Sequence, residues 1–191
     1  MRKKSHVSLS RYLIESVDST LLDNHRKAFI VGSILPDCKP SFVTTRHTIE
    51  ETFDMVTEFI SKLTVDSSDF KKISTAYCRK LGEVTHYVAD YFTYPHNDIF
   101  DGNIKDHCIY EKELKKALKE YISSDEVHVN RDIASSFETP DQLCDYVKNH
   151  HTQYLANENN VESDCRYIVA LCHIVVGGIL NMLELESAKA A

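Results

Sequence analysis

Glycine and proline are scarce in this chain: five glycines and four prolines occur in 191 residues. Folds made of strands and turns need frequent turn residues, so this scarcity argues against a β-sandwich or a β-barrel and favours long helices. A chain of this length can bury roughly 70% of its unfolded surface, which is enough for a core without disulfide bonds. We therefore predict one all-α domain over residues 1–191, built as a bundle of several helices.

The six cysteines form no CxxC pair and no dense framework, so we expect reduced and mostly buried thiols. The chain starts MRKKSHVSLSRYLIESV. No apolar run of about seven residues follows its basic start, which predicts no secretory signal peptide and a cytoplasmic location. The most apolar stretch, residues 167–185, is interrupted by His173 and by Gly177–Gly178. We expect it to be a buried core helix rather than a membrane span.

Acidic residues outnumber basic ones by 29 to 22, and the net charge of −7 argues against a broad basic surface for nucleic acid. Ten histidines are many for this length and are the first indication of chemistry. The Lys-rich run KELKKALKE at residues 112–120 has two readings. It predicts either a solvated helix face or a transient contact with an anionic membrane surface.

Apolar periodicity and turn residues predict a succession of helices. The expected ranges are 6–16 with Ser5 as its cap, 23–31 ending near Gly32, 47–63, 68 or 69 to 92 or 93, 106–122, 139–155 and 163–186. Residues 97–105 are expected to form a loop, because they contain Asp101-Gly102-Asn103. Alternation at residues 126–131 is too brief to predict a sheet.

The stretch THYVADYFTYPH at residues 85–96 carries the main motif. His86 and Asp90 are four residues apart in a predicted helix, so both side chains lie on one face and can converge on one ion. Pro95 ends the helix and sets a turn that could bring His96 back towards that face. Imidazole and carboxylate together are the ligands that zinc prefers in hydrolytic sites.

A second pair with the same spacing follows, His107 and Glu111, at the start of the next predicted helix. Upstream, Asp37 lies in a predicted loop between helices, and His47 begins the helix after it. Glu51 competes for His47 at the same spacing, and we expect that pair to be an ordinary contact on a helix surface. Two such pairs together with these upstream residues predict a metal site that performs chemistry.

In this order, Asp37, His47, the HxxxD of His86 and Asp90, His96, and the HxxxE of His107 and Glu111, the chain resembles the zinc-dependent phospholipase C family. That family shares its fold with the fungal single-strand nucleases. The resemblance covers most of the chain, from His6 to about Glu111 by motif. It implies an all-helical bundle with zinc ions in a cleft and a phosphodiesterase that hydrolyses phospholipid or a related phosphodiester. It does not imply nucleic acid as the partner.

The same resemblance implies a role for each residue. The first ion would be held by His47, His86 and Asp90, with Asp37 as a ligand or the general base; the second by His96, His107 and Glu111; and a third by His6 with a bridging Asp90. We expect about two zinc ions, with room for a third. Asp37 would orient or deprotonate the attacking water.

Two features set this chain apart from family members, and a third separates it from the nuclease relatives. Secreted members begin, after processing, with a Trp whose amino group and carbonyl bind the third ion, and this chain has no Trp. The third position is therefore open to water, filled differently or absent. Cys38 follows Asp37 where secreted members place an aromatic residue, so a cation–π partner for choline is missing there. Nuclease relatives usually carry Asp at the position of Glu111, which favours the phospholipase branch.

Two other functions stay open. A nuclease-like phosphodiesterase would need aromatic side chains on which bases stack, and Tyr87, Tyr91 and Tyr94 are candidates that are equally good core residues. A protein of this fold could also bind metal without significant turnover. The helical phosphohydrolases built on an adjacent His-Asp doublet are excluded by motif, because no His in this sequence is directly followed by Asp.

The remaining histidines predict structural roles. We expect His128 and the pair His150–His151 on exposed helix faces. His173 lies in the most apolar helix, where a hydrogen-bonded core histidine is the expectation.

Overall fold

The computed structural model describes residues 1–39, 46–64, 74–127, 129–157 and 159–189. Across these residues all regular structure is helical and no strand is found, which confirms the predicted all-α class. The helices are α1 (Lys3–Ser16), α2 (Thr20–Asn24), α3 (Arg26–Ile34), α4 (Ile49–Thr64), α5 (Ser74–Tyr91), α6 (Ile104–Tyr121), α7 (Arg131–Ser135), α8 (Pro140–Ala156) and α9 (Val161–Lys189). Two short 3₁₀ segments, η1 (Pro36–Cys38) and η4 (Tyr94–His96), follow α3 and α5.

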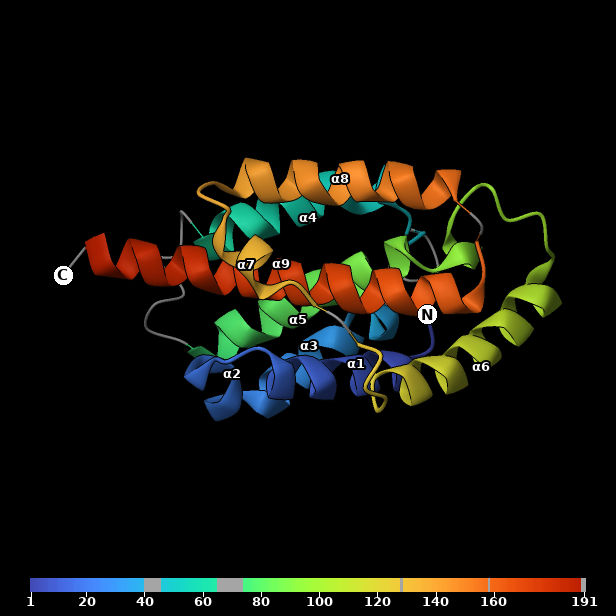
Figure 1. Ribbon diagram of the computed structural model, residues 1–191, viewed down its shortest axis with the longest axis horizontal. Helices are drawn as coiled ribbons and strands as arrows, with labels where there is room; N and C mark the ends of the chain where they lie inside the picture. Colours follow the sequence, from blue (N-terminus) through green and yellow to red (C-terminus); the bar gives the residue numbers. More distant parts are fainter. Residues whose placement is uncertain (40–45, 65–73, 128, 158, 190–191) are drawn as a thin grey trace.

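Helices α5 and α9 form the middle of the bundle (Figure 1). Helix α5 packs against α3 and α4, and α9 packs against α4, α6, α7 and α8. In the view of Figure 1, α1, α2 and α3 lie below this central pair, α4 and α8 lie above it, and α6 lies at one end. Helix α1 contacts both α6 and α9, so the start of the chain lies at the end of the bundle that carries α6.

Helix α9 runs through the core. Over Val161–Glu186 it is long and apolar enough to cross a membrane, but 67% of its most apolar window is buried inside the protein. The side chains of Ile168, Cys172, Val175 and Ile179 recur at helical spacing and are fully buried. This burial agrees with the core helix that we expected over residues 167–185.

Helices α3 and α5 meet backbone to backbone at two glycines. A Cβ atom at Gly32 would lie 2.0 Å from the carbonyl oxygen of Arg79, and one at Gly82 would lie 2.2 Å from that of Phe29. Only glycine lets the two helix backbones come this close. His86 lies one turn after Gly82, and its Nδ1 donates a hydrogen bond of 2.8 Å to the carbonyl oxygen of Ser33 on α3.

The first two predicted helices need correction. Helix α1 begins at Lys3, and Ser5 is not its cap but lies buried in the first turn, because contacts of the preceding residues with the core hold that turn in place. The range predicted as one helix over 23–31 is divided at His25, where φ −123° and ψ 28° leave the helical region. Helix α3 then continues past Gly32, because this glycine serves the contact with α5 rather than a helix end.

The later helices agree better with expectation. Helices α4, α6, α8 and α9 begin and end within three residues of their predicted bounds. The predicted start of the fourth helix, at 68 or 69, lies outside the described residues. Helix α6 begins at Ile104, because Asn103 and Asp106 form a capping box just ahead of the predicted start. Helix α7 was not predicted.

The outlying histidines divide into correct and incorrect predictions. His173 is 3% exposed and its Nε2 lies 3.4 Å from the carbonyl oxygen of Ser16, as expected of a core histidine. The prediction of an exposed face is wrong for His151, which is 4% exposed and donates a hydrogen bond of 2.8 Å to Oδ1 of Asn97. Its helix turns this side towards the core, because the loop after α5 supplies a buried amide there. His128 lies outside the described residues.

All six cysteines are free thiols. Four are buried, as expected, and burial raises the pKa of Cys78 to about 11 and that of Cys165 to about 12. Cys38 and Cys108 are exposed, which agrees with the expectation that most, not all, of the thiols are buried.

The glycine contact between α3 and α5 leads to a prediction. Gly82→Ala should lower the free energy of unfolding by about 3 kcal/mol, because the added methyl group meets main-chain atoms that cannot move independently. Gly178→Ala is the matched control, since its methyl group would meet a Phe137 ring carbon at 3.2 Å, which can shift. That change should cost less than about 1 kcal/mol. Urea unfolding measures both values, and equal effects would contradict the role assigned to the contact.

Candidate metal centre

The eight side chains predicted as metal ligands converge at one end of the bundle. They come from α1, η1, the residue pair before α4, α5, η4 and α6. In chain order they are His6, Asp37, His47, His86, Asp90, His96, His107 and Glu111. The structure therefore brings together residues that are up to 105 positions apart, from His6 to Glu111.

Three donor atoms form the first set. Nδ1 of His47 lies 2.9 Å from Nε2 of His86, and these nitrogens lie 3.1 Å and 3.2 Å from Oδ2 of Asp90. Ligand atoms of a tetrahedral zinc ion, with bonds of about 2.0–2.1 Å, lie about 3.3 Å apart. The side chains of His86 and Asp90 are fully buried. The set thus has the chemistry and the spacing of a metal site.

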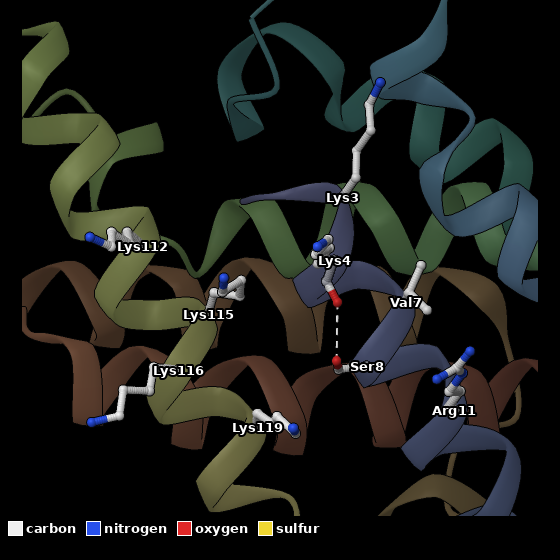
Figure 2. A pocket seen from close by; sticks show the side chains of 9 residues that line it. All are labelled: Lys3, Lys4, Val7, Ser8, Arg11, Lys112, Lys115, Lys116 and Lys119. Atoms are coloured by element: carbon white, nitrogen blue, oxygen red, sulfur yellow. Dashed lines mark hydrogen bonds between the residues drawn. The ribbon is translucent and has the colours of Figure 1, made fainter.

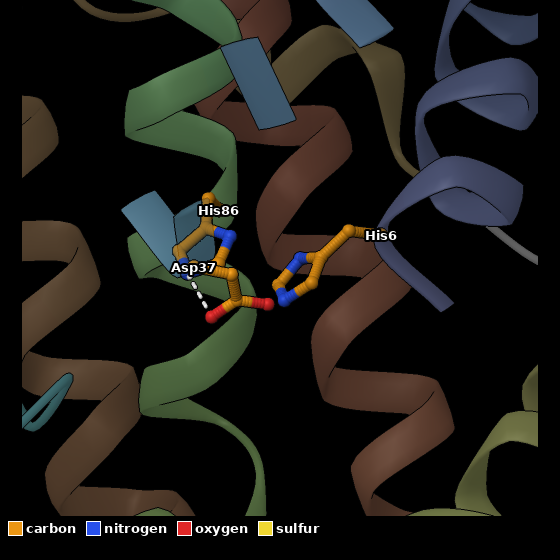
Figure 3. A group of neighbouring side chains, drawn as sticks. All are labelled: His6, Asp37 and His86. Atoms are coloured by element: carbon orange, nitrogen blue, oxygen red, sulfur yellow. Dashed lines mark ion pairs between the residues drawn. The ribbon is translucent and has the colours of Figure 1, made fainter. Parts of the chain in front are cut away.

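Asp37 and His6 lie beside His86 of the first set (Figure 3). Oδ1 of Asp37 lies 3.7 Å from Nε2 of His86, and the ring of His6 stacks on that of His86 with centroids 4.0 Å apart. Nε2 of His6 lies 3.3 Å from Oδ1 of Asp90. Both ring nitrogens of His6 are buried without a hydrogen bond to any part of the chain that the structure describes. A buried unpaired nitrogen is costly, and a metal ion is a partner that would remove the cost.

A second set lies nearer the surface. Oε1 of Glu111 lies 3.5 Å from Nε2 of His96 and 3.3 Å from Nε2 of His107. Their side chains are 15%, 13% and 33% exposed, respectively. This set has the same ligand chemistry as the first but faces solvent.

The nitrogen of Met1 lies between the two sets. It is 2.7 Å from Oδ1 of Asp90, 2.8 Å from Nε2 of His96 and 3.2 Å from Oε1 of Glu111. Burial lowers the pKa of this amino group, but the charges of Asp90 and Glu111 outweigh burial and raise it overall. Sequence reasoning named an N-terminal amino group only for secreted family members and did not assign Met1 to the site.

The carboxylates of the site differ in their electrostatics. Burial alone would raise the pKa of Asp90, but the Met1 amino group and the imidazoles of His96 and His86 hold it well below its usual range. For Glu111, burial is likewise outweighed by hydrogen bonds from His107 and His96, which lower the pKa. Burial raises the pKa of Asp37. Asp90 and Glu111 are therefore firmly anionic, whereas Asp37 is a stronger base than an ordinary Asp.

Contacts with neighbouring residues hold the ligands near α5 in place. Because the Ser33 carbonyl accepts the proton on Nδ1 of His86, a neutral imidazole presents the lone pair of Nε2 to the site. Asp37 follows Pro36 in η1, and the next turn is tied to α5 by Nζ of Lys39, which lies 2.9 Å from the buried Glu83 carboxylate.

The loop that carries His96 is held from two other helices. Nδ2 of Asn97 donates to the carbonyl oxygens of Tyr91 and Thr93 at the end of α5, while its Oδ1 accepts from His151 of α8. Sequence reasoning missed Asn97 and His151, since neither stands at ligand spacing.

Asp164 of α9 holds the same loop by accepting a hydrogen bond of 2.9 Å from the backbone N–H of Tyr94. It also accepts from the hydroxyls of Tyr110 and Tyr154, so one buried carboxylate joins α6, α8, α9 and the loop. Burial raises the pKa of Asp164 to about 6. No sequence pattern singled out this residue.

The metal centre opens into a cavity of ≈ 740 Å³. Its lining includes Asp37, His47, His96, His107 and Glu111, together with three cationic residues that the motif did not include: Arg2, Lys3 and Arg46. Among the lining residues that the structure describes, none is Phe, Tyr or Trp. The cavity can therefore receive an anionic group above the metal ligands but offers no aromatic cage.

The protein is an all-helical bundle with two sets of imidazole and carboxylate donors beneath a cavity. This arrangement is typical of metal-binding hydrolases. A family model for zinc-dependent phospholipase C matches residues 5–161, and the chain belongs to this family. No curated protein and no solved structure matches the chain. Membership confirms the resemblance drawn from the sequence, implies zinc dependence and supports a metal-dependent phospholipase or phosphodiesterase activity.

The first prediction from this geometry concerns metal content. Nε2 of His86 can serve one ion only, and it belongs to both buried donor groups, so those groups share an ion. We expect about two zinc ions per chain, one in each set. After dialysis against zinc, elemental analysis should show about one equivalent of zinc less in Glu111→Gln than in the unchanged protein. Glu113→Gln should show no loss of zinc. Less than one equivalent in the unchanged protein would contradict the site.

The second prediction concerns pH. Burial lowers the pKa of His6 to about 3, so the folded chain without metal holds this ring neutral. The stability that depends on the neutral ring is present above the unfolded pKa of about 6.5 and is lost as pH falls towards 3. By pH 5 the loss is about 2 kcal/mol.

Urea unfolding in chelator at pH 7 and pH 5 checks this expectation. His6→Phe keeps a ring on His86 and should remove most of the pH dependence that His6 contributes. His25→Phe, at a half-buried position in contact with Thr75, should keep the dependence of the unchanged protein. If the free energy of unfolding changes by the same amount between pH 7 and pH 5 in His6→Phe and in the unchanged protein, His6 does not titrate as proposed.

Proposed function

We propose that the chain is a zinc-dependent phosphodiesterase whose substrate is a phospholipid or a related phosphodiester. The observation that carries the proposal is the convergence of eight imidazole and carboxylate side chains, five of which line the cavity. Zinc bound there would supply Lewis acidity and a bound water with a pKa of about 7. The buried ring nitrogens of His6 make no hydrogen bond in the described part of the chain, and Nε2 lies 3.3 Å from the Asp90 carboxylate, which supports a site that metal would complete.

Asp37 is the residue best situated to act as general base. It lines the cavity, and its Oδ1 lies 3.7 Å from Nε2 of His86 and 3.9 Å from Nδ1 of His47. From there it can orient a water molecule and accept its proton. The raised pKa of Asp37, which burial causes, suits this role better than the strongly lowered pKa of Asp90.

We assign substrate binding to the cationic residues at the rim of the cavity. Arg2, Lys3 and Arg46 line it, and Nη1 of Arg46 lies 3.2 Å from Oδ1 of Asp98, which holds the guanidinium at the rim. Cations there can contact the charged oxygens of a phosphodiester. The aromatic residue that would bind choline is missing from the described lining, as the sequence predicted at Cys38. We therefore propose a headgroup other than choline.

The same lining disfavours the nuclease alternative. Tyr91 is fully buried and Tyr87 is 8% exposed, packed edge-on against the rings of His47 and His86. Tyr94 donates its hydroxyl to the carbonyl oxygen of Ile99. None of the three lines the cavity, so they offer no stacking surface for bases.

The test substitutes Asp90, whose two carboxylate oxygens face different groups of donors. Asp90→Asn keeps the shape but removes the negative charge, and it should lower hydrolysis of bis(p-nitrophenyl) phosphate at least about 100-fold at saturating zinc. The reason is that Asp90 balances the charge at the centre of the site. Glu113→Gln, on the exposed face of α6, should leave the rate unchanged.

The substrate class is checked with the same proteins. Phospholipid in mixed micelles should be hydrolysed, and the activity on it should fall in parallel with that on the soluble diester in Asp90→Asn. Faster hydrolysis of single-stranded DNA would favour the nuclease function. Zinc binding without hydrolysis of any of the three substrates would favour a metal-binding protein without turnover.

A further inference from the structure

Basic side chains line a groove between α1 and α6 (Figure 2). The groove has a volume of ≈ 670 Å³, and among the residues that the structure describes its lining contains seven Lys or Arg residues and no carboxylate. Helix α1 contributes Lys3, Lys4 and Arg11, and helix α6 contributes Lys112, Lys115, Lys116 and Lys119. We call this surface the basic groove.

The charge of the basic groove is scarcely compensated. Of its seven cations, only Lys116 has an acidic partner within 4.0 Å among the described residues, namely Glu120 at 3.8 Å on the exposed face of α6. The chain as a whole carries a net charge of −7. Cations gathered on one face of an acidic protein repel one another, which costs free energy. A surface that carries charge of one sign in this way attracts a polyanion.

The basic groove is continuous with the mouth of the metal centre. Lys3 lines both the groove and the cavity above the metal ligands. On α6, Ile104 and Cys108 at the cavity and Lys112 in the groove follow at spacings of four, so they share one helix face. Ile104 is 84% exposed. A large apolar side chain in water thus stands beside the cations at the rim of the cavity.

We propose that the basic groove, together with Ile104, docks the protein on an anionic lipid bilayer so that the metal cavity faces the membrane. Lysines beside an anionic surface and an apolar side chain that enters the interface are the two components of such adsorption. The choice of a bilayer rests on the proposed function, in that its substrate is a phospholipid. The groove itself agrees, since none of its described lining residues is an aromatic on which bases could stack.

Vesicle sedimentation with the zinc-loaded full chain tests the proposal. Vesicles of phosphatidylcholine with about 30% phosphatidylglycerol should bind it, and vesicles of phosphatidylcholine alone should not. Each lysine near such a surface strengthens binding about fivefold. The variant with Lys112, Lys115, Lys116 and Lys119 all changed to Gln should therefore bind at least about 100-fold more weakly.

A control of equal charge separates the groove from net charge. Changing Lys27, Lys62, Lys148 and Arg166 to Gln removes as many cations from other helices and should alter vesicle binding less than about threefold. Both variants should keep the helical circular-dichroism signal of the unchanged protein, which shows that they fold. Equal loss of binding in the two variants, or no binding of anionic vesicles at all, would overturn the proposal.

Ile104→Ser distinguishes a bilayer from a dissolved polyanion. The change should weaken vesicle binding several-fold and leave binding of a single-stranded oligonucleotide unaltered, because only a bilayer can accept the apolar side chain. Tighter binding of the oligonucleotide than of anionic vesicles would assign the groove to nucleic acid instead. Vesicle binding requires no turnover, so a protein that adsorbs but hydrolyses nothing would refute the proposed function alone.

Discussion

The backbone contact between α3 and α5 is the constraint from which the site follows. With Gly32 and Gly82 at the crossing, the Ser33 carbonyl comes within 2.8 Å of Nδ1 of His86. That hydrogen bond determines which nitrogen of His86 carries the proton and where Nε2 points. Any residue with a Cβ at either glycine would separate the helices and leave a buried imidazole without its partner. Packing and ligand chemistry therefore depend on the same two residues.

Asp90 couples the metal centre to the fold. Its side chain is fully buried, and its oxygens lie within 3.3 Å of donors from α1, α5 and the residue pair before α4. A buried carboxylate is tolerated only when charged or hydrogen-bonding groups surround it. Those groups here come from distant parts of the chain, so the interactions that keep Asp90 ionised also hold the helices together. Metal bound at this point would strengthen the fold as well as supply chemistry.

Much of the fold and the predicted ligand groups could be derived from sequence because both depend on local spacing. The pairs His86–Asp90 and His107–Glu111 lie on helices whose periodicity was clear, and the structure brings them to one place. Tertiary contacts could not be derived in this way. His151 has polar neighbours in the sequence, as residues on a surface helix do. Its side chain is nevertheless buried and hydrogen-bonded to the amide oxygen of Asn97. Ser5 resembles a cap, but contacts of Met1 with Asp90 set where α1 begins.

The two donor sets differ in depth, and this difference decides how a substrate can approach. His86 and Asp90 have no exposed side-chain surface, whereas His107 at the second set is 33% exposed and lines the cavity. In the proposed function, a substrate would therefore reach the α6 side of the centre before His86 and Asp90, which lie beneath the cavity. Helix α6 carries the candidate ligands His107 and Glu111 and, further along, the lysines of the basic groove, so one helix orients both sets of side chains. A rotation of α6 would displace both, which is why its capping box and its hydrogen bond to Asp164 matter for the site as well as for the helix.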